Sequence, residues 1–152
     1  MKKTFNEWLN QKPKVIITTT PTGQNYFYEL FNEHTTYEVK GDDHKTIWYK
    51  DGLKHREDGP AIEWTNGDKE WYQHGVPYRK NGPTVERTNG NLYWHNKKGE
   101  LHREDGPAIK IKNQITGKFT YRYYIHGVEF TKEQFKMIIN SRYGINSRYG
   151  LN

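Results

Sequence analysis

Three tryptophans, Trp48, Trp71 and Trp94, follow one another at a constant interval of 23 residues, and the residues between them repeat in type. A glycine comes four or five residues after each tryptophan, a proline lies eight residues beyond the glycine, and a β-branched residue follows two positions later. These repeated positions are Gly52, Gly75 and Gly99; Pro60, Pro83 and Pro107; and Ile62, Val85 and Ile109. A unit this short has room for one β-hairpin and a connection, but not for two packed helices.

The turn residues inside each unit also favour hairpins. Thr65-Asn66-Gly67 and Thr88-Asn89-Gly90 each separate short segments rich in β-branched and aromatic residues, and Asn-Gly is a strong hairpin signal. The Asp-Gly-Pro or Asn-Gly-Pro of each unit is expected to turn the chain between hairpins, with the glycine at positive φ. Upstream, two further hairpins are predicted, with turns at residues 21–23 and 41–43.

A lone hairpin cannot bury its rings, so we expect the hairpins to stack, with rings touching from unit to unit at Trp48, Trp71, Trp94 and Tyr123. The expected fold is mainly β: a single-layer array of stacked antiparallel β-hairpins with short N- and C-terminal helices. Capping-box residues at 4–7 and 131–134 predict the helix starts. The expected segments are a helix at 1–12, hairpins at 13–47, the repeat array at 48–130, a helix at 131–144 and a tail at 145–152.

Composition narrows the class of protein. The 152 residues form one domain, and the core must depend on rings because 32% of residues are hydrophobic while 15% are aromatic. The absence of cysteine excludes disulfides and thiolate chemistry. No segment reads as a signal peptide or a membrane span, so a cytoplasmic location is expected. The net charge of +6 is compatible with acidic or nucleic-acid partners.

The octapeptide HREDGPAI occurs at residues 55–62 and again at 102–109. With the following Asn-Gly turns and Trp-Tyr strands, it resembles the HREDGPA repeats of bacteriophage and bacterial hypothetical proteins, which are similar to MORN-type repeats. The resemblance covers about residues 48–135 and implies stacked β-hairpins. The resemblance is uninformative about activity; MORN proteins generally serve as scaffolds for protein interaction or membrane apposition. The middle unit departs from the pattern with Tyr78-Arg79-Lys80-Asn81.

Two interpretations of HREDGPA compete. His55 with Glu57 or Asp58, and His102 with Asp105, could serve as acid–base or metal groups. The middle unit lacks this set yet keeps Arg79, which favours a structural role in which each arginine bonds a carboxylate or amide in its own unit or in a neighbouring one. The expected structural arginines are Arg56, Arg79 and Arg103, and their expected acceptors are Asp58, Asn81 and Asp105. We therefore expect no catalytic residue, no metal site and no cofactor; no phosphate-binding loop occurs and the seven histidines are scattered.

A binding surface is predicted in the central units, where tyrosines alternate with cations. We expect a non-catalytic protein, encoded by a phage, that binds and inhibits or adapts a host protein. The alternative is a binder of nucleic acid or nucleotides, including a counter-defence nucleotide sponge. Membrane association is a weaker option, and homo-oligomers remain open. The candidate binding residues are Tyr49, Tyr72, Tyr78, Arg79, Lys80, Arg87, Tyr93, Lys97 and Lys98.

Overall fold

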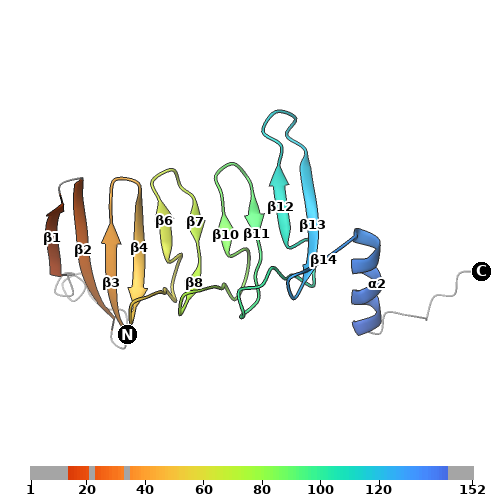
Figure 1. The fold of residues 1–152 in the computed structure, drawn as a ribbon, viewed down its shortest axis with the longest axis horizontal. Helices are drawn as coiled ribbons and strands as arrows, with labels where there is room; N and C mark the ends of the chain where they lie inside the picture. Colours follow the sequence, from red (N-terminus) through yellow and green to blue (C-terminus); the bar gives the residue numbers. More distant parts are fainter. Residues whose placement is uncertain (1–13, 21–22, 33–34, 144–152) are drawn as a thin grey trace, which may run out of the picture.

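A computed structural model describes the backbone of residues 14–20, 23–32 and 35–143, and the side chains from Val39 to Tyr143. The helix predicted at 1–12 and the tail predicted at 145–152 lie outside the described residues. The described part is mainly β, with antiparallel strand pairing and one helix near its C-terminal end (Figure 1). The prediction of a mainly β chain with a C-terminal helix is confirmed.

The strands of the first hairpins are the longest. They are β1 (Lys14–Thr20), β2 (Gly23–Asn32), β3 (Thr35–Gly41) and β4 (Lys45–Lys50). Strand β1 pairs with β2, β2 with β3 and β3 with β4, so that Thr20 lies opposite Gly23 and Gly41 opposite Thr46. Both upstream hairpins are therefore present, and the chain reverses at the predicted positions.

The repeat region consists of shorter strands. They are β5 (Leu53–Lys54), β6 (Ile62–Trp64), β7 (Lys69–Glu70), β8 (Tyr72–Gln73), β9 (Val76–Pro77), β10 (Val85–Glu86), β11 (Leu92–Tyr93), β12 (Ile109–Lys112), β13 (Phe119–Ile125) and β14 (Val128–Phe130). The sheet runs in the order β1-β2-β3-β4-β6-β7-β10-β11-β12-β13-β14, with β5 on β4, while β8 and β9 form a separate pair. Neighbours in the sheet are close in the chain, so the hairpins follow one another along the sheet in sequence order (Figure 1).

Two-residue turns join several strand pairs at the Trp-x3-Gly connections. Asp51, His74 and His126 have φ near +50°, and the glycine after each is also at positive φ. Two successive left-handed residues give the tight hairpin turn whose twist suits the flanking strands. These turns place β5 after β4, β9 after β8, and β14 after β13. His74 and His126 are therefore turn residues.

Side chains alternate between two faces of the sheet. We call them the Ile face, which carries Ile62, Val85 and Ile109 in direct cross-strand register with neighbouring strands, and the Trp face, which carries Trp48, Trp71 and Trp94. The backbone N–H of each of these tryptophans donates to a carbonyl of the neighbouring strand at 2.8 Å. The acceptors are Ala61, Thr84 and Ala108, respectively. Those three small residues are 0–1% exposed, so each lies where a larger side chain would not fit.

The middle unit replaces an alanine–tyrosine pair by Thr84 and His95. In the following unit, the corresponding residues are Ala108 and Tyr124, the residue after Tyr123, and both are buried in one cluster. In the middle unit, Thr84 Oγ1 lies 2.6 Å from Nδ1 of His95 and donates to the carbonyl of Tyr93. Two polar residues thus satisfy each other at a buried position, and burial lowers the pKa of His95.

The expected stacking of rings from unit to unit is wrong in one respect. Among the described residues, no ring pair joins two of Trp48, Trp71 and Trp94; each indole is instead covered by an arginine. Tyr123 does make a ring contact, but with Phe135 of the helix, at 4.9 Å between centroids. A planar guanidinium stacks well on an aromatic face, so an arginine occupies the place on each indole that a neighbouring ring was expected to fill.

Helix α2 (Lys132–Tyr143) begins at the predicted capping box. The backbone N–H of Thr131 donates to Oε1 of Gln134, and the backbone N–H of Gln134 donates to Oγ1 of Thr131. Phe135 is the buried residue of this helix and packs on Tyr123 of β13. The helix therefore covers the last ring of the series.

Candidate binding surface

The same arginine-on-tryptophan contact occurs in three successive units. The guanidinium carbon lies 4.1 Å from the ring centroid in the pair Arg56–Trp48, 3.8 Å in Arg79–Trp71 and 4.2 Å in Arg103–Trp94. Such a cation–π contact stabilises by about 0.5–2 kcal/mol, depending on how far it is removed from water. We call this contact the Arg–Trp clamp, and the loops that it holds are loop 1 (residues 55–60), loop 2 (78–83) and loop 3 (102–107).

Each clamp arginine also bonds the loop that carries it. In all three units, Nη1 donates to the carbonyl of the loop proline, at 3.2–3.4 Å for Pro60, Pro83 and Pro107. Nε donates to the carboxylate two residues later, at 2.9 Å for Asp58 and 2.7 Å for Asp105. The predicted Arg56–Asp58 and Arg103–Asp105 pairs are therefore present.

The middle clamp differs from the prediction. No hydrogen bond joins Arg79 to Asn81 in the described structure; Nη1 of Arg79 instead donates to Oε1 of Glu86 at 2.5 Å. The carboxylate of Glu86 extends from the adjacent strand on the Trp face and supplies the acceptor that the neutral amide does not. Arg56 has both kinds of partner, since its Nη1 also donates to Glu63 at 3.4 Å.

The loop glycine is required mainly because a side chain at its position would collide with the arginine of the Arg–Trp clamp. A Cβ added at Gly59 would lie 2.9 Å from Cζ of Arg56, and one at Gly106 would lie 3.3 Å from Cζ of Arg103. The expectation of positive φ holds for Gly82, at +101°, but not for Gly59 or Gly106, which are absent from the left-handed region. The arginine is thus held between an indole on one side and a glycine on the other.

The HREDGPA histidines join each loop to the next unit. Nδ1 of His55 accepts the backbone N–H of His74 at 3.1 Å, and Nδ1 of His102 accepts that of His126 at 3.0 Å. The paired rings lie 4.3 and 4.4 Å apart. Burial is the main cause that lowers the pKa of both His55 and His102. A histidine that accepts at Nδ1 and is neutral must carry its proton on Nε2.

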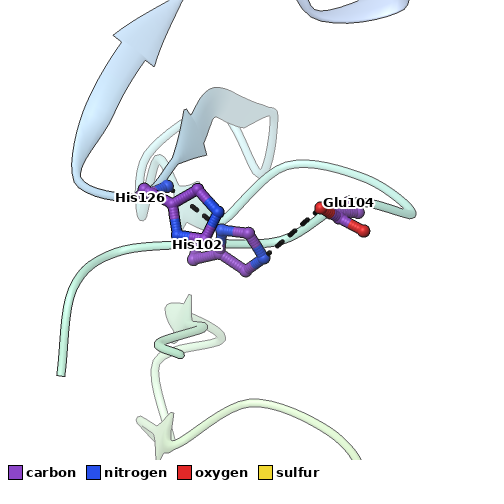
Figure 2. Close-up of side chains that lie close together, drawn as sticks. All are labelled: His102, Glu104 and His126. Carbon is purple, nitrogen blue, oxygen red and sulfur yellow. Dashed lines mark hydrogen bonds and ion pairs between the residues drawn. The ribbon is translucent and has the colours of Figure 1, made fainter. Parts of the chain in front are cut away.

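One group of potential metal ligands occurs among the described residues, namely His102, Glu104 and His126, whose ligand atoms lie within 4.8 Å of one another (Figure 2). Nε2 of His102 lies 3.9 Å from Oε1 of Glu104. Glu104 is held from the other side by Arg142 at 2.7 Å and by the hydroxyl of Tyr143. Ligation through Nε2 would require the proton to move to Nδ1, which the N–H of His126 already occupies. The geometry therefore favours a structural tie over a metal centre.

Several predicted binding residues pack against neighbours on the Ile face. Lys40 lies 5.1 Å above the ring of Tyr49, and Lys54 lies 5.0 Å above that of Tyr72. The hydroxyl of Tyr72 donates to Glu70, and burial raises its pKa to about 12. Arg87 pairs with Glu70 at 2.9 Å. Tyr93 lies on the same face and packs against the buried Ala108–Tyr124 cluster.

The other predicted residues lie in loop 2 or at a turn. Tyr78, Arg79 and Lys80 line grooves between successive loops, whereas Lys97 and Lys98 are exposed in the turn before Gly99. One groove, of about 270 Å³, lies between loops 1 and 2; the other, of about 510 Å³, lies between loops 2 and 3. The structure thus separates the predicted surface into packed tyrosines on the Ile face and a loop surface on the Trp face.

Sequence reasoning missed a second exposed surface on the β12–β13 hairpin. Ile115, Phe119 and Tyr121 are exposed there, at 95%, 37% and 48% of their full surface. Two signals could have found it: the turn grows longer in this unit, and residues 110–122 contain four cations and no acid. The prediction instead placed the binding surface in the central units of the array.

Comparison with protein-family models, with curated proteins and with solved structures finds no match for this chain. Within the described residues, no helix combines the length and the hydropathy needed to cross a bilayer.

Proposed function

We propose that this chain is a non-catalytic binding protein, built as a MORN-like array of stacked hairpins, that recognises a host protein through loops 1, 2 and 3. The observation that carries the proposal is the threefold Arg–Trp clamp. Its geometry is constant in all three units, while the loops that it holds differ in charge: loops 1 and 3 have the same sequence, and loop 2 between them carries Lys80 and Asn81 where they carry acids. Recognition residues are commonly placed on loops that a rigid scaffold positions.

The charges of the three loops alternate. Loop 1 exposes Glu57 and Asp58, loop 2 exposes Lys80 and Asn81, and loop 3 exposes Asp105. Charge patterns of this kind favour a partner of the opposite pattern and disfavour others, because like charges brought together cost several kcal/mol. The two inter-loop grooves offer places where partner side chains would enter.

The bonding of the HREDGPA residues supports a non-catalytic role. A general acid or base needs a titratable atom that faces substrate. Here Nδ1 of His102 accepts a backbone N–H and the guanidinium of Arg103 is stacked and doubly bonded to Asp105. These groups maintain the loop, so we expect no catalysis from them.

From the HREDGPA units we also propose that the chain belongs with the bacteriophage and bacterial repeat proteins that it resembles, and that it inhibits or adapts its host partner. The second candidate function is nucleic-acid or nucleotide binding, including sequestration of a signalling nucleotide. The net charge of +6 and the cations of loop 2 favour that candidate.

The test is affinity purification of the full chain from nuclease-treated host lysate, with the variants Lys80→Glu and Lys136→Glu. Lys80 lies in loop 2, whereas Lys136 is an exposed residue of α2 and gives the same change of charge. We expect one host protein to be retained in stoichiometric amount by the parent chain and by Lys136→Glu, but not by Lys80→Glu. Equal retention by both variants, or no stoichiometric protein at all, contradicts the proposal.

A further inference from the structure

The β12–β13 hairpin is built differently from the other hairpins of the repeat region. Its strands are longer than those of β6–β7 and β10–β11, and it extends beyond them (Figure 1). It is also anchored to its neighbour: the backbone N–H of Lys112 donates to Oδ1 of Asn91 at 2.8 Å, and Nε2 of Gln114 donates to the carbonyl of Asn89 at 3.0 Å. The side chains that it exposes are therefore held by a fixed backbone.

Aromatic residues alternate along β13. Phe119, Tyr121 and Tyr123 occupy every second position, so all three point to the Trp face. The rings of Phe119 and Tyr121 lie 6.2 Å apart and are nearly parallel, at 30° between planes. The tryptophans of earlier units are buried or half-buried, whereas Phe119 and Tyr121 are 37% and 48% exposed.

A lysine lies directly across the sheet from each exposed ring. Lys110 is the register partner of Tyr121, and Lys112 is that of Phe119, so both lysines share the Trp face with the rings. Nζ of Lys110 lies 4.0 Å from the centroid of Phe119. The aliphatic part of the Lys112 side chain lies against Gly90 of the adjacent turn. This contact positions Lys112 beside the ring of Phe119.

The charge of this surface is positive and unbalanced. Residues 110–122 contain Lys110, Lys112, Lys118 and Arg122 and no acid. Arg122 is neutralised by a bidentate pair with Glu129, at 2.7 Å for both bonds, which leaves the three lysines. A partner for this surface must therefore carry negative charge.

A groove continues the ring surface towards α2. It measures about 630 Å³ and is lined in part by Tyr121, Tyr123, Phe130, Lys132 and Gln134. The carboxylate of Glu129 also borders the groove, but its charge is met by Arg122 and its Oε2 accepts the hydroxyl of Tyr124 at 2.9 Å. Flat aromatic surface and positive charge thus run together from the hairpin to the start of the helix.

We propose that this surface binds single-stranded nucleic acid, with bases stacked on Phe119 and Tyr121 and phosphates on Lys110 and Lys112. Aromatic rings with interleaved cations are the recurring device for binding single strands, since every base has a face that can stack. A paired duplex hides those faces and would meet only the lysines. The inference is independent of the loop surface, because neither ring nor lysine belongs to loops 1, 2 or 3.

The experiment is fluorescence anisotropy with the full chain and labelled single-stranded DNA or RNA of about 12 nucleotides at low salt. Phe119→Ala and Tyr121→Ala are expected to weaken binding by about tenfold each, whereas Phe119→Tyr, which keeps a ring, should bind like the parent chain. Lys112→Gln should reduce the slope of log affinity against log salt by about 0.7 for one lost phosphate contact. Lys136→Gln, outside the surface, is the charge control.

Four outcomes of the anisotropy experiment overturn the inference. They are no binding at low salt, affinity unchanged by both ring variants, equal weakening by Lys112→Gln and Lys136→Gln, and preference for duplex over single strand. A parallel titration with anionic phosphatidylserine vesicles separates a lipid surface from a nucleic acid: binding to vesicles without binding to oligonucleotide also contradicts it. Circular dichroism of each variant checks that the sheet is intact. We expect it to be, because Phe119 and Tyr121 are partly exposed and are not core residues.

Discussion

At the scale of single residues, HREDGPA is a set of chemically active side chains used for structure. The arginine lies against an indole, the aspartate and the proline carbonyl accept its N–H groups, and the glycine makes room for it. The histidine accepts an N–H from the following unit. The arginine, aspartate, proline, glycine and histidine of the motif therefore each make a contact that holds the loop or joins it to the next unit.

The clamp predicts the effect of Gly59→Ala. The added methyl group would lie 2.9 Å from Cζ of Arg56 and would displace the guanidinium from Trp48. We expect the free energy of unfolding to fall by about 1 kcal/mol, the value of one cation–π contact with its associated hydrogen bonds. Urea unfolding followed by tryptophan fluorescence measures this change.

Gly41→Ala is the matched control, because its new Cβ would meet atoms no closer than 3.6 Å. In an Arg56→Ala background, the Gly59→Ala change should cost little or nothing, since the guanidinium is no longer there to be displaced. The same loss in both backgrounds would mean that Gly59 is required for another reason.

At the scale of elements, α2 occupies the place of a clamp. Arg56 and Arg79 each come eight residues after their tryptophan, and Thr131, the cap of α2, comes eight residues after Tyr123. Phe135 then covers Tyr123 as the arginines cover the indoles. Glu104 of loop 3 holds the far end of the helix through Arg142 and Tyr143.

Phe135→Ala is expected to release the helix while the sheet persists. A helix of 12 residues is marginal in water without tertiary contacts, and Phe135 is its buried residue. Hydrogen exchange should show the amides of α2 losing protection while those of β4, β6 and β7 keep theirs. Met137→Ala, at an exposed position of the same helix, should change neither set.

Loss of protection throughout the sheet in Phe135→Ala would show that the helix and the array unfold as one unit. Unchanged protection of α2 would show that the contact with Tyr123 does not hold the helix.

At the scale of the whole molecule, side-chain links between hairpins recur along the sheet. Two of them depend on neutral histidines, His55 and His102, and a third joins the half-buried His95 to the buried Thr84. Burial is the largest cause that lowers the pKa of each. The stability of the array is therefore linked to pH through three places along its length.

The direction of this dependence follows from linkage. The unfolded chain binds protons at these histidines near the ordinary pKa of 6.5, whereas the folded chain binds them only at lower pH. The stabilisation is therefore complete above about pH 6.5 and is lost as pH falls towards the lowered folded pKa values. We expect the urea midpoint to fall between about pH 7.5 and pH 5, above the range in which carboxylates titrate.

His102→Asn tests the assignment, because the amide oxygen can accept the N–H of His126 but does not titrate. Its midpoint should vary less with pH than that of the parent chain. His44→Asn, at an exposed position, is the control and should keep the parent profile. A midpoint that rises on acidification, or a profile unaffected by His102→Asn, would contradict the linkage.

Prediction from the sequence succeeded where residues close in the chain decide the outcome. The hairpin turns, the capping box of Thr131 and the Arg56–Asp58 and Arg103–Asp105 pairs each involve residues at most a few positions apart. It failed for Arg79, whose acceptor is Glu86 on the next strand. It also grouped Tyr49, Tyr72 and Tyr93 with the loop cations, although those tyrosines lie on the opposite face.

The sequence by itself determined the β-hairpin that repeats along this protein. Turns, caps and the alternation of side chains follow from local backbone preferences and from the spacing of a few residues. Only the tertiary structure decided which side chains meet. The partner of His102, the exposure of Phe119 and Tyr121, and the closeness of Glu104 to α2 depend on strand register and on which face of the sheet a neighbour covers. Those are contacts between residues far apart in the chain, and no local preference fixes them.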